Sequence, residues 1–259
     1  MQRRVLALEA RLRGCRNVHT IGVRPNFEDY SDDEIGWIRA ADKIYYPTAY
    51  YADLFDAVGK TTFPSYHNYK CTQDKIKQSA LFQLAGLPHP KTRVFYGKRQ
   101  QSGIGDRFSF PYIAKEPRGS AMGRGVFLIS NEKDLQAYLH DRHVAYVQEY
   151  LPIDRDIRIV VIGNQVVHAY WRIAQAGEFR TNVARGGRIC LDPVPPKAMD
   201  LALQTATTCG WDDVGIDICC HAGQYMIIEA NMKYGKEGFR AAGIDYIKLM
   251  EQLINDDRI

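Results

Sequence analysis

One stretch indicates the fold of this 259-residue chain more clearly than any other: VGIDICCHAGQYMIIEANM, residues 214–232. Its two apolar runs, Ile216–Cys219 and Gln224–Ala230, predict two antiparallel strands joined by a tight turn at His221–Gln224. We expect a three-residue turn centred on Gly223. The stretch therefore predicts a β-hairpin, from which the rest of the chain can be interpreted.

Three polar side chains converge in this hairpin. The expected turn sets Asp217 directly across from Glu229, and alternation along a strand turns Glu229 and Asn231 to the same face. Two carboxylates and an amide oxygen form the hard-oxygen environment that Mg²⁺ prefers. An ordinary hairpin with exposed acids is the alternative, but Glu229 follows an apolar run, where an unpaired carboxylate is costly. We therefore predict that Asp217, Glu229 and Asn231 hold one or two Mg²⁺, with Mn²⁺ able to substitute.

The composition is typical of a soluble globular protein, with 46% hydrophobic and 25% charged residues. A net charge of +4 is too weak to indicate nucleic acid, although it suits an anionic ligand such as a nucleotide. No apolar run approaches the length of a membrane span, so we expect neither nucleic acid nor a membrane as a partner. The six cysteines show no paired spacing and are expected to be reduced thiols of a cytoplasmic protein.

The first 70 residues predict a small lobe. Residues 1–15 are expected to form a short basic amphipathic helix, and residues 17–65 a βαβαβ unit. Ser31–Glu34 is a capping box that opens the first helix of that unit. The expected divisions are an N-terminal lobe at 1–70 and a larger domain at 71–259, made of a central subdomain at 71–150 and a C-terminal, metal-binding subdomain at 151–259.

The larger domain alternates strands and helices, which indicates an α/β (α+β) protein. Gly163-Asn164 is close to the favoured hairpin turns and joins two of the strands. The expected elements are helices at 72–85, 132–141, 197–209 and 246–254, and strands at 112–116, 126–129, 145–150, 157–162 and 165–172, besides the hairpin already described.

Further polar clusters suit an anionic nucleotide. Lys115 precedes the Gly-rich loop 118–125, whose backbone N–H groups can approach phosphate oxygens, although a plain Gly-rich hairpin explains the loop equally well. An apolar strand ends in Gln148-Glu149-Tyr150, which suits a purine but also a solvated strand end. A polar loop carries more arginine forks than a solvated face usually needs. That cluster consists of Arg172, Arg180, Asn182, Arg185 and the pair Gly186-Gly187.

Taken in order, these residues resemble the RimK-like branch of the ATP-grasp superfamily, which contains the ribosomal protein S6 glutamate ligases. The resemblance covers about residues 72–254, and no single element is specific whereas the ordered set is. It is carried by Asp74-Lys75, Lys115, Gln148-Glu149-Tyr150, Asp156-Ile157-Arg158, Gly177-Glu178-Phe179-Arg180-Thr181-Asn182, Gly186-Gly187, Gly215-Ile216-Asp217 and Glu229-Ala230-Asn231. The resemblance implies two α/β lobes that grip ATP, preceded by the small N-terminal lobe.

The resemblance also implies roles for the residues of the larger domain. Arg180 and Asn182 would lie near the γ-phosphate and the acyl phosphate, and Arg172 would serve the donor carboxylate or the transferring phosphoryl group. Asp217, Glu229 and Asn231 would hold Mg²⁺. The residues that would contact ATP are Lys75, Lys115, Gly119, Ser120, Gln148, Glu149, Tyr150, Leu151, Asp156 and Arg180.

The implied activity is ATP-dependent ligation of a carboxylate substrate to an amine through an acyl phosphate. The donor would be an amino acid such as glutamate, and the acceptor a protein tail, a peptide or a small molecule. Two alternatives stay open, namely a non-catalytic ATP-binding regulatory or scaffold module and a ligase with another nucleophile. Lys233 and Tyr234 stand where relatives carry Ser and Pro, which leaves the acceptor undefined. Relatives also suggest a homo-oligomer.

Overall fold

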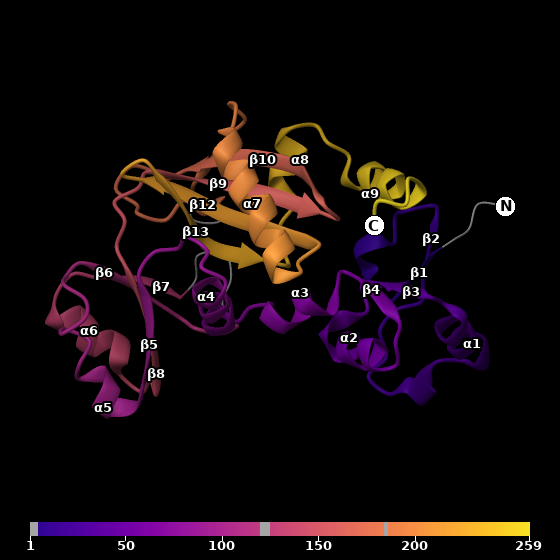
Figure 1. Ribbon diagram of the computed structural model, residues 1–259, viewed down its shortest axis with the longest axis horizontal. Helices are drawn as coiled ribbons and strands as arrows, with labels where there is room; N and C mark the ends of the chain where they lie inside the picture. Colours follow the sequence, from indigo (N-terminus) through magenta and orange to yellow (C-terminus); the bar gives the residue numbers. More distant parts are fainter. Residues whose placement is uncertain (1–4, 120–124, 184–185) are drawn as a thin grey trace.

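The strands form three separate sheets in the computed structural model, which describes residues 5–119, 125–183 and 186–259. Figure 1 shows the five-stranded sheet of the C-terminal half lying between the other two sheets. The expected mixed α/β class is therefore confirmed. No helix in the described ranges combines the length and the apolar character needed to cross a membrane.

The first sheet is parallel and comes from the N-terminal residues. Its strands lie in the order β2 (Val18–Thr20), β1 (Val5–Ala7), β3 (Lys43–Tyr45) and β4 (Thr61–Phe63). The connections carry η2 (Phe27–Asp29), α1 (Asp32–Ala40) and α2 (Thr48–Ala57). The predicted capping box is present, because the Ser31 side chain accepts from the Glu34 N–H and the Glu34 carboxylate accepts from the Ser31 N–H.

The prediction for the N-terminal segment was wrong. In place of an amphipathic helix at 1–15, the described part of this segment forms strand β1 and the 3₁₀ helix η1 (Ala10–Leu12). Leu6, Ala7 and Leu8 are all buried, and β1 pairs with β2 on one side and β3 on the other. An amphipathic helix would bury one face, whereas a central strand of a parallel sheet buries both.

The second sheet is antiparallel, in the order β5 (Thr92–Tyr96), β8 (Val144–Glu149), β6 (Tyr112–Lys115) and β7 (Val126–Ile129). Helices α5 (Gly97–Gln101) and α6 (Glu132–Leu139) accompany it, and Asn131 caps α6 through the Asp134 N–H. Leu135 and Tyr138 of α6 pack with Phe95 and Phe108 in one buried cluster. The strand β5 and helix α5 were not anticipated from the sequence.

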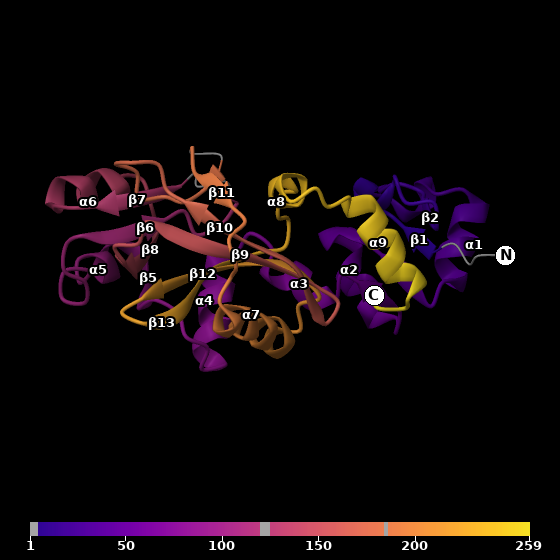
Figure 2. The ribbon, with the colours of Figure 1, turned by 90° about the horizontal axis from the view of Figure 1, so that it is seen from above.

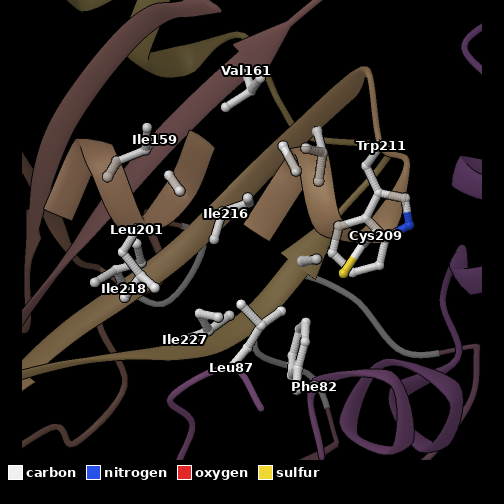
Figure 3. Packing of buried hydrophobic residues seen from close by; sticks show 14 of the residues in the cluster. Phe82, Leu87, Ile159, Val161, Leu201, Cys209, Trp211, Ile216, Ile218 and Ile227 are labelled. Carbon is white, nitrogen blue, oxygen red and sulfur yellow. The ribbon is translucent and has the colours of Figure 1, made fainter. Parts of the chain in front are cut away.

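The third sheet lies in the order β11 (Arg188–Cys190), β10 (Gln165–Ile173), β9 (Arg155–Ile162), β12 (Asp213–His221) and β13 (Gln224–Asn231). Helices α4 (Lys75–Leu84) and α7 (Pro196–Cys209) cover one of its faces. Figure 3 shows this core, in which Phe82 and Leu201 meet Ile159, Ile216 and Ile227 of the strands. The charged residues that alternate with these apolar ones project from the opposite face, namely Asp156, Arg158, Asp213 and Asp217.

The predicted pair in the C-terminal hairpin is correct, but the predicted turn is not. Asp217 pairs with Glu229 as expected. The turn, however, has two residues, because His221 pairs directly with Gln224. A β-bulge at Ile228 supplies the extra residue, since Ile218 pairs with Ile227 and the next pair is Asp217 with Glu229. The bulge thus produces the offset that a three-residue turn would have given.

The C-terminal helix joins the two ends of the chain. After α8 (Glu237–Ala241), helix α9 (Tyr246–Asn255) lies beside the N-terminal sheet, as Figures 1 and 2 both show. The Asn17 amide donates to the Glu251 carbonyl at 3.0 Å, and the Tyr45 hydroxyl donates to the Ile259 carbonyl at 2.8 Å. Helix α3 (Tyr66–Cys71) makes the second link, because it leads from the first sheet into α4.

Candidate functional site

A cleft between the second and third sheets brings most of the predicted site residues together. One wall comes from β6 and β8, and the other from β9, β10, β12 and β13. The predicted residues that line it are Lys115, Gln148, Glu149, Tyr150, Leu151, Asp156, Arg172, Arg180, Asn182, Asp217 and Glu229. Two further predicted residues contact the lining, since Lys75 pairs with Glu229 and Asn231 donates to Asp217. Gly119 does not line the cleft. Ser120 and Arg185 lie outside the described residues.

Asp217 is a buried carboxylate held by two guanidinium groups. Arg158 reaches both carboxylate oxygens, Arg172 lies 2.9 Å from Oδ2, and the Asn231 amide donates to Oδ2 at 3.2 Å. Burial alone would raise the pKa of Asp217, but the charges of Arg158 and Arg172 outweigh burial and hold it below its ordinary value. Asp217 is therefore a buried carboxylate that stays ionised and could serve as an oxygen ligand.

Arg172 bridges Asp217 to a second buried acid. Its Nε donates to Asp156 Oδ1 at 2.7 Å, its Nη2 donates to Asp156 Oδ2 at 2.5 Å, and Thr181 donates to the same Oδ2 at 2.6 Å. Direct cross-strand pairing sets Asp156 beside Arg172 and Asp217 beside Arg158. The face of the third sheet thus carries the alternating chain Arg158–Asp217–Arg172–Asp156, in which the charges neutralise one another.

Two lysines lie near the Glu229 carboxylate. Lys75 Nζ lies 3.1 Å from Glu229 Oε1. Burial lowers the pKa of Lys115 to about 8, although the nearby Glu229 carboxylate opposes the shift. Lys75 is the first residue of α4, whose N-cap Asp74 accepts from the Lys77 N–H at 3.0 Å and from Arg118 Nε at 2.9 Å. The helix start and the base of the Gly-rich loop are therefore tied together.

The remaining wall of the cleft is apolar and was largely missed by the sequence analysis. Its members are Pro90, Ile113, Val126, Ile153, Phe179, Cys219 and Ile228. Ile113 could have been found, because it lies two positions before Lys115 on β6 and shares its face. Ile228 could not, because only the bulge lets it line the cleft beside its chain neighbour Glu229.

The side chains predicted to contact the phosphates and the base already form hydrogen bonds within the protein. The Arg180 guanidinium donates to the Glu178 carboxylate at 2.9 Å and 2.6 Å, and these hydrogen bonds lower the pKa of Glu178 to about 2. Gln148 donates to the Thr92 hydroxyl at 3.0 Å, and Glu149 accepts from the Lys91 N–H at 2.5 Å. Each side chain is thereby oriented before any ligand enters.

The donor set of the hairpin suits Mg²⁺. Asp217 and Glu229 supply ionised or ionisable carboxylates, and Asn231 supplies an amide that already lies against Asp217. Across the described ranges, no group of three His, Cys, Asp or Glu side chains is placed to hold a metal ion, and a third protein oxygen here would come from the Asn231 amide. The residues therefore fit a hard divalent cation with open positions for water or phosphate.

Comparison with known proteins identifies the family. A family model described as the RimK-like ATP-grasp domain matches residues 72–254. The ribosomal protein bS6–L-glutamate ligases of Salmonella paratyphi B and Salmonella newport are 31% identical over 191 residues, which cover 70% of this chain. The match spans 63% of the length of those relatives.

Solved structures show the same fold. A RimK domain ATP-grasp protein from Sphaerobacter thermophilus aligns with a TM-score of 0.71 at 17% identity, over 96% of this chain and 98% of that one. The ATP-grasp ligase PsnB, in complex with a phosphomimetic precursor variant, Mg and ADP, aligns with a TM-score of 0.74 at 17% identity, over 98% of each chain. The D-alanine–D-alanine ligase of Bacillus anthracis aligns at 0.65 with 14% identity, over 92% of this chain and 85% of that one.

Proposed function

The chain belongs to the RimK-like ATP-grasp family, and we propose that it is an ATP- and Mg²⁺-dependent carboxylate–amine ligase. One observation carries the proposal: Lys115 on one wall of the cleft faces the Asp217 and Glu229 carboxylates on the other. A cation opposite a hard-oxygen cluster suits the triphosphate of a nucleotide with its bound metal ion. A module that only bound nucleotide would have no need of the complete set.

The proposed reaction has two steps. A substrate carboxylate attacks the γ-phosphorus of ATP, and the bond to the bridging oxygen breaks to give an acyl phosphate and ADP. An amine then attacks the acyl carbon, loses a proton and expels inorganic phosphate. Mg²⁺ held by Asp217, Glu229 and Asn231 would neutralise phosphate charge. Lys115 and Arg180 would hold the charge that develops on the transferring group, because phosphoryl transfer depends on positioning and electrostatics.

The remaining lining residues have positioning roles in this proposal. Gln148, Glu149, Tyr150 and Leu151 would frame the adenine against the apolar wall of the cleft, and Asp156 would contact the ribose. Asp156 and Arg172 already bind one another, so ligand contacts would add to that ion pair and need not replace it. Lys75 and Gly119 would complete the phosphate contacts from the start of α4 and the base of the Gly-rich loop.

We propose an amino acid such as glutamate as the carboxylate or amine substrate, and a protein tail, a peptide or a small molecule as its partner in the bond. The curated relatives are ligases of L-glutamate to ribosomal protein bS6, and PsnB has been solved with a precursor peptide. These names support the substrate class for this chain. This chain matches 63% of the length of the glutamate ligases and shares its fold with PsnB.

The test is ADP release from Mg·ATP against a panel of amino acids, each offered alone and with peptide acceptors, with mass spectrometry of the products. We expect one amino acid to stimulate ADP release and to give a condensed product. Lys115→Ala and Asp217→Asn should abolish the stimulation, whereas the exposed Asp256→Asn should leave it unchanged. Stimulation that survives Asp217→Asn would contradict the assignment of the site. ATP binding without any turnover would favour the non-catalytic module.

A further inference from the structure

The second sheet has an edge with free hydrogen-bonding groups. Within the described residues, strand β5 is the outermost strand of this sheet and pairs with β8 alone. The ladder is flanked by the bonds from the Glu149 N–H to the Lys91 carbonyl at 2.9 Å and from the Gly97 N–H to the His143 carbonyl at 2.8 Å. Hydrogen-bonded pairs alternate in an antiparallel ladder. The backbone N–H and carbonyl groups of the odd-numbered residues of β5 therefore point toward β8, and those of the even-numbered residues point outward.

Side chains cap this outward edge at both ends. The Thr92 carbonyl accepts from the Gln83 amide of α4 at 3.2 Å, and the Tyr96 N–H donates to the Gln100 side chain at 2.8 Å. Between them, neither the N–H nor the carbonyl of Val94 has a partner among the residues that the structure describes. An exposed strand edge of this kind is a template for pairing with another chain.

Val94 lies in a groove between β5 and α4, and the groove is basic. Ile76 and Ala80 of α4 form one apolar side of it. The exposed cations Lys91, Arg93 and Arg107 line it, and none of the described residues that line it is acidic. Two of them stand close together, because Lys91 Nζ donates to the Arg107 carbonyl at 2.6 Å. In the described ranges no carboxylate forms an ion pair with any of the three cations.

We propose that this groove binds an extended peptide segment that carries acidic side chains, which adds as a strand to the edge of β5. The backbone of Val94 would supply main-chain hydrogen bonds, and alternate acidic side chains would meet the cations, which is the usual division of labour in strand addition. A cluster of like charges whose side chains form no ion pair with a carboxylate of the described residues favours an anionic partner by charge complementarity. The partner is a protein segment, because the free groups are those of a strand edge.

The groove is distinct from the proposed ATP site but adjoins it. Thr92 separates the two, because it lines the groove while its hydroxyl accepts from Gln148 of the cleft. The groove would thus hold an acidic partner next to the catalytic cleft without entering it. Binding there does not require turnover, so this proposal and the proposed ligase activity can fail separately.

The test is fluorescence anisotropy with a labelled peptide of alternating Glu and Val, beside the same peptide with Gln for Glu. We expect the Glu peptide to bind at least tenfold more tightly. The double variant Lys91→Glu and Arg93→Glu should lose at least tenfold in affinity, whereas Arg99→Glu with Lys133→Glu, on the same lobe and with the same change in charge, should lose less than twofold. Thermal unfolding of both variants checks that they fold.

A second measurement uses the unchanged protein. The Glu peptide with N-methyl groups on alternate residues keeps its charge but cannot pair along a strand, and we expect it to bind at least fivefold more weakly. Equal affinity for the methylated peptide would overturn strand addition. Equal affinity for the Glu and Gln peptides, or equal loss in the two double variants, would overturn the acidic partner. Tighter binding of a single-stranded oligonucleotide that displaces the peptide would assign the groove to nucleic acid instead.

Discussion

Asp217 and the two arginines around it define the site at the scale of single residues. A carboxylate inside a sheet would be protonated if it were left alone, because burial disfavours the charged form. Arg158 and Arg172 reverse this preference and leave an ionised carboxylate whose orientation is held from both sides. Arg172 therefore has a structural part in the site in addition to the contact with the reacting groups that we propose for it.

Replacing Arg158 tests this orientation. We expect Arg158→Met to lower the free energy of unfolding by about 3–5 kcal/mol, because it leaves a buried charge with one partner fewer. Arg158→Lys should recover part of this loss but weaken Mg²⁺ binding, since one ammonium cannot hold both carboxylate oxygens. Urea denaturation and calorimetric titration with Mg²⁺ measure the two effects. Unchanged Mg²⁺ affinity in Arg158→Lys would show that Arg158 only balances charge.

Lys115 predicts a pH dependence for nucleotide binding. Its pKa of about 8 lies below the ordinary value, because the charged form is desolvated by burial. The lysine is therefore cationic below about pH 8 and loses its charge above it. We expect the affinity of the metal-free protein for ATP to fall by about tenfold or more between pH 7.5 and pH 9.5. Lys115→Arg should abolish this fall, because arginine stays charged throughout.

At the scale of elements, the start of α4 links the helix to the phosphate loop. Asp74 caps the helix through the Lys77 N–H and binds Arg118 at the base of the loop. The backbone supports the same link, because the Lys75 N–H donates to the Pro117 carbonyl at 2.9 Å and the Gly119 N–H donates to the Gln73 carbonyl at 3.1 Å. Helix and loop should therefore respond together to changes at Asp74.

Two substitutions of Asp74 separate the cap from the ion pair. Asp74→Ala removes both and should lower the free energy of unfolding by about 1 kcal/mol, the typical value of an N-cap. Asp74→Asn keeps a cap of similar quality but loses the charge that holds Arg118, so we expect near-normal stability and a raised KM for ATP. Thermal unfolding and steady-state kinetics distinguish the two. Equal KM values for Asp74→Asn and the unmodified protein would show that Arg118 needs no anchor.

At the scale of the whole molecule, a buried polar cluster joins the N-terminal lobe to the rest. Asp213 is fully buried on β12 and accepts from the Tyr46 hydroxyl at 2.7 Å and the Tyr234 hydroxyl at 2.5 Å. Arg11 lies 3.9 Å from this carboxylate, and its guanidinium stands over the rings of Tyr46, Tyr234 and Tyr246. Tyr234, which stands where relatives carry Pro, is thus part of the junction between the N-terminal lobe and the rest of the chain.

Breaking this cluster should loosen the junction. Burial raises the pKa of Asp213, and the Arg11 guanidinium opposes that rise. We expect Arg11→Met to cost about 3 kcal/mol or more of unfolding free energy, because it removes one partner of a buried ion pair. Tyr46→Phe removes one of several hydrogen bonds and should cost about 1 kcal/mol. Urea denaturation followed by circular dichroism measures both. A smaller loss in Arg11→Met than in Tyr46→Phe would indicate that Asp213 is protonated in the folded protein.

The sequence alone determined the order of the motifs and most elements of the larger domain. These follow from local alternation and turn chemistry, which act between near neighbours in the chain. Tertiary structure decided what depends on distant partners: the burial that makes residues 5–7 a strand, the placement of α9 on the N-terminal sheet, and the clamp of Arg158 and Arg172 on Asp217. The pairing of Asp217 with Glu229 belongs to both groups. The sequence predicted the pair, but the structure forms it through a bulge at Ile228 and a two-residue turn, not through the predicted three-residue turn.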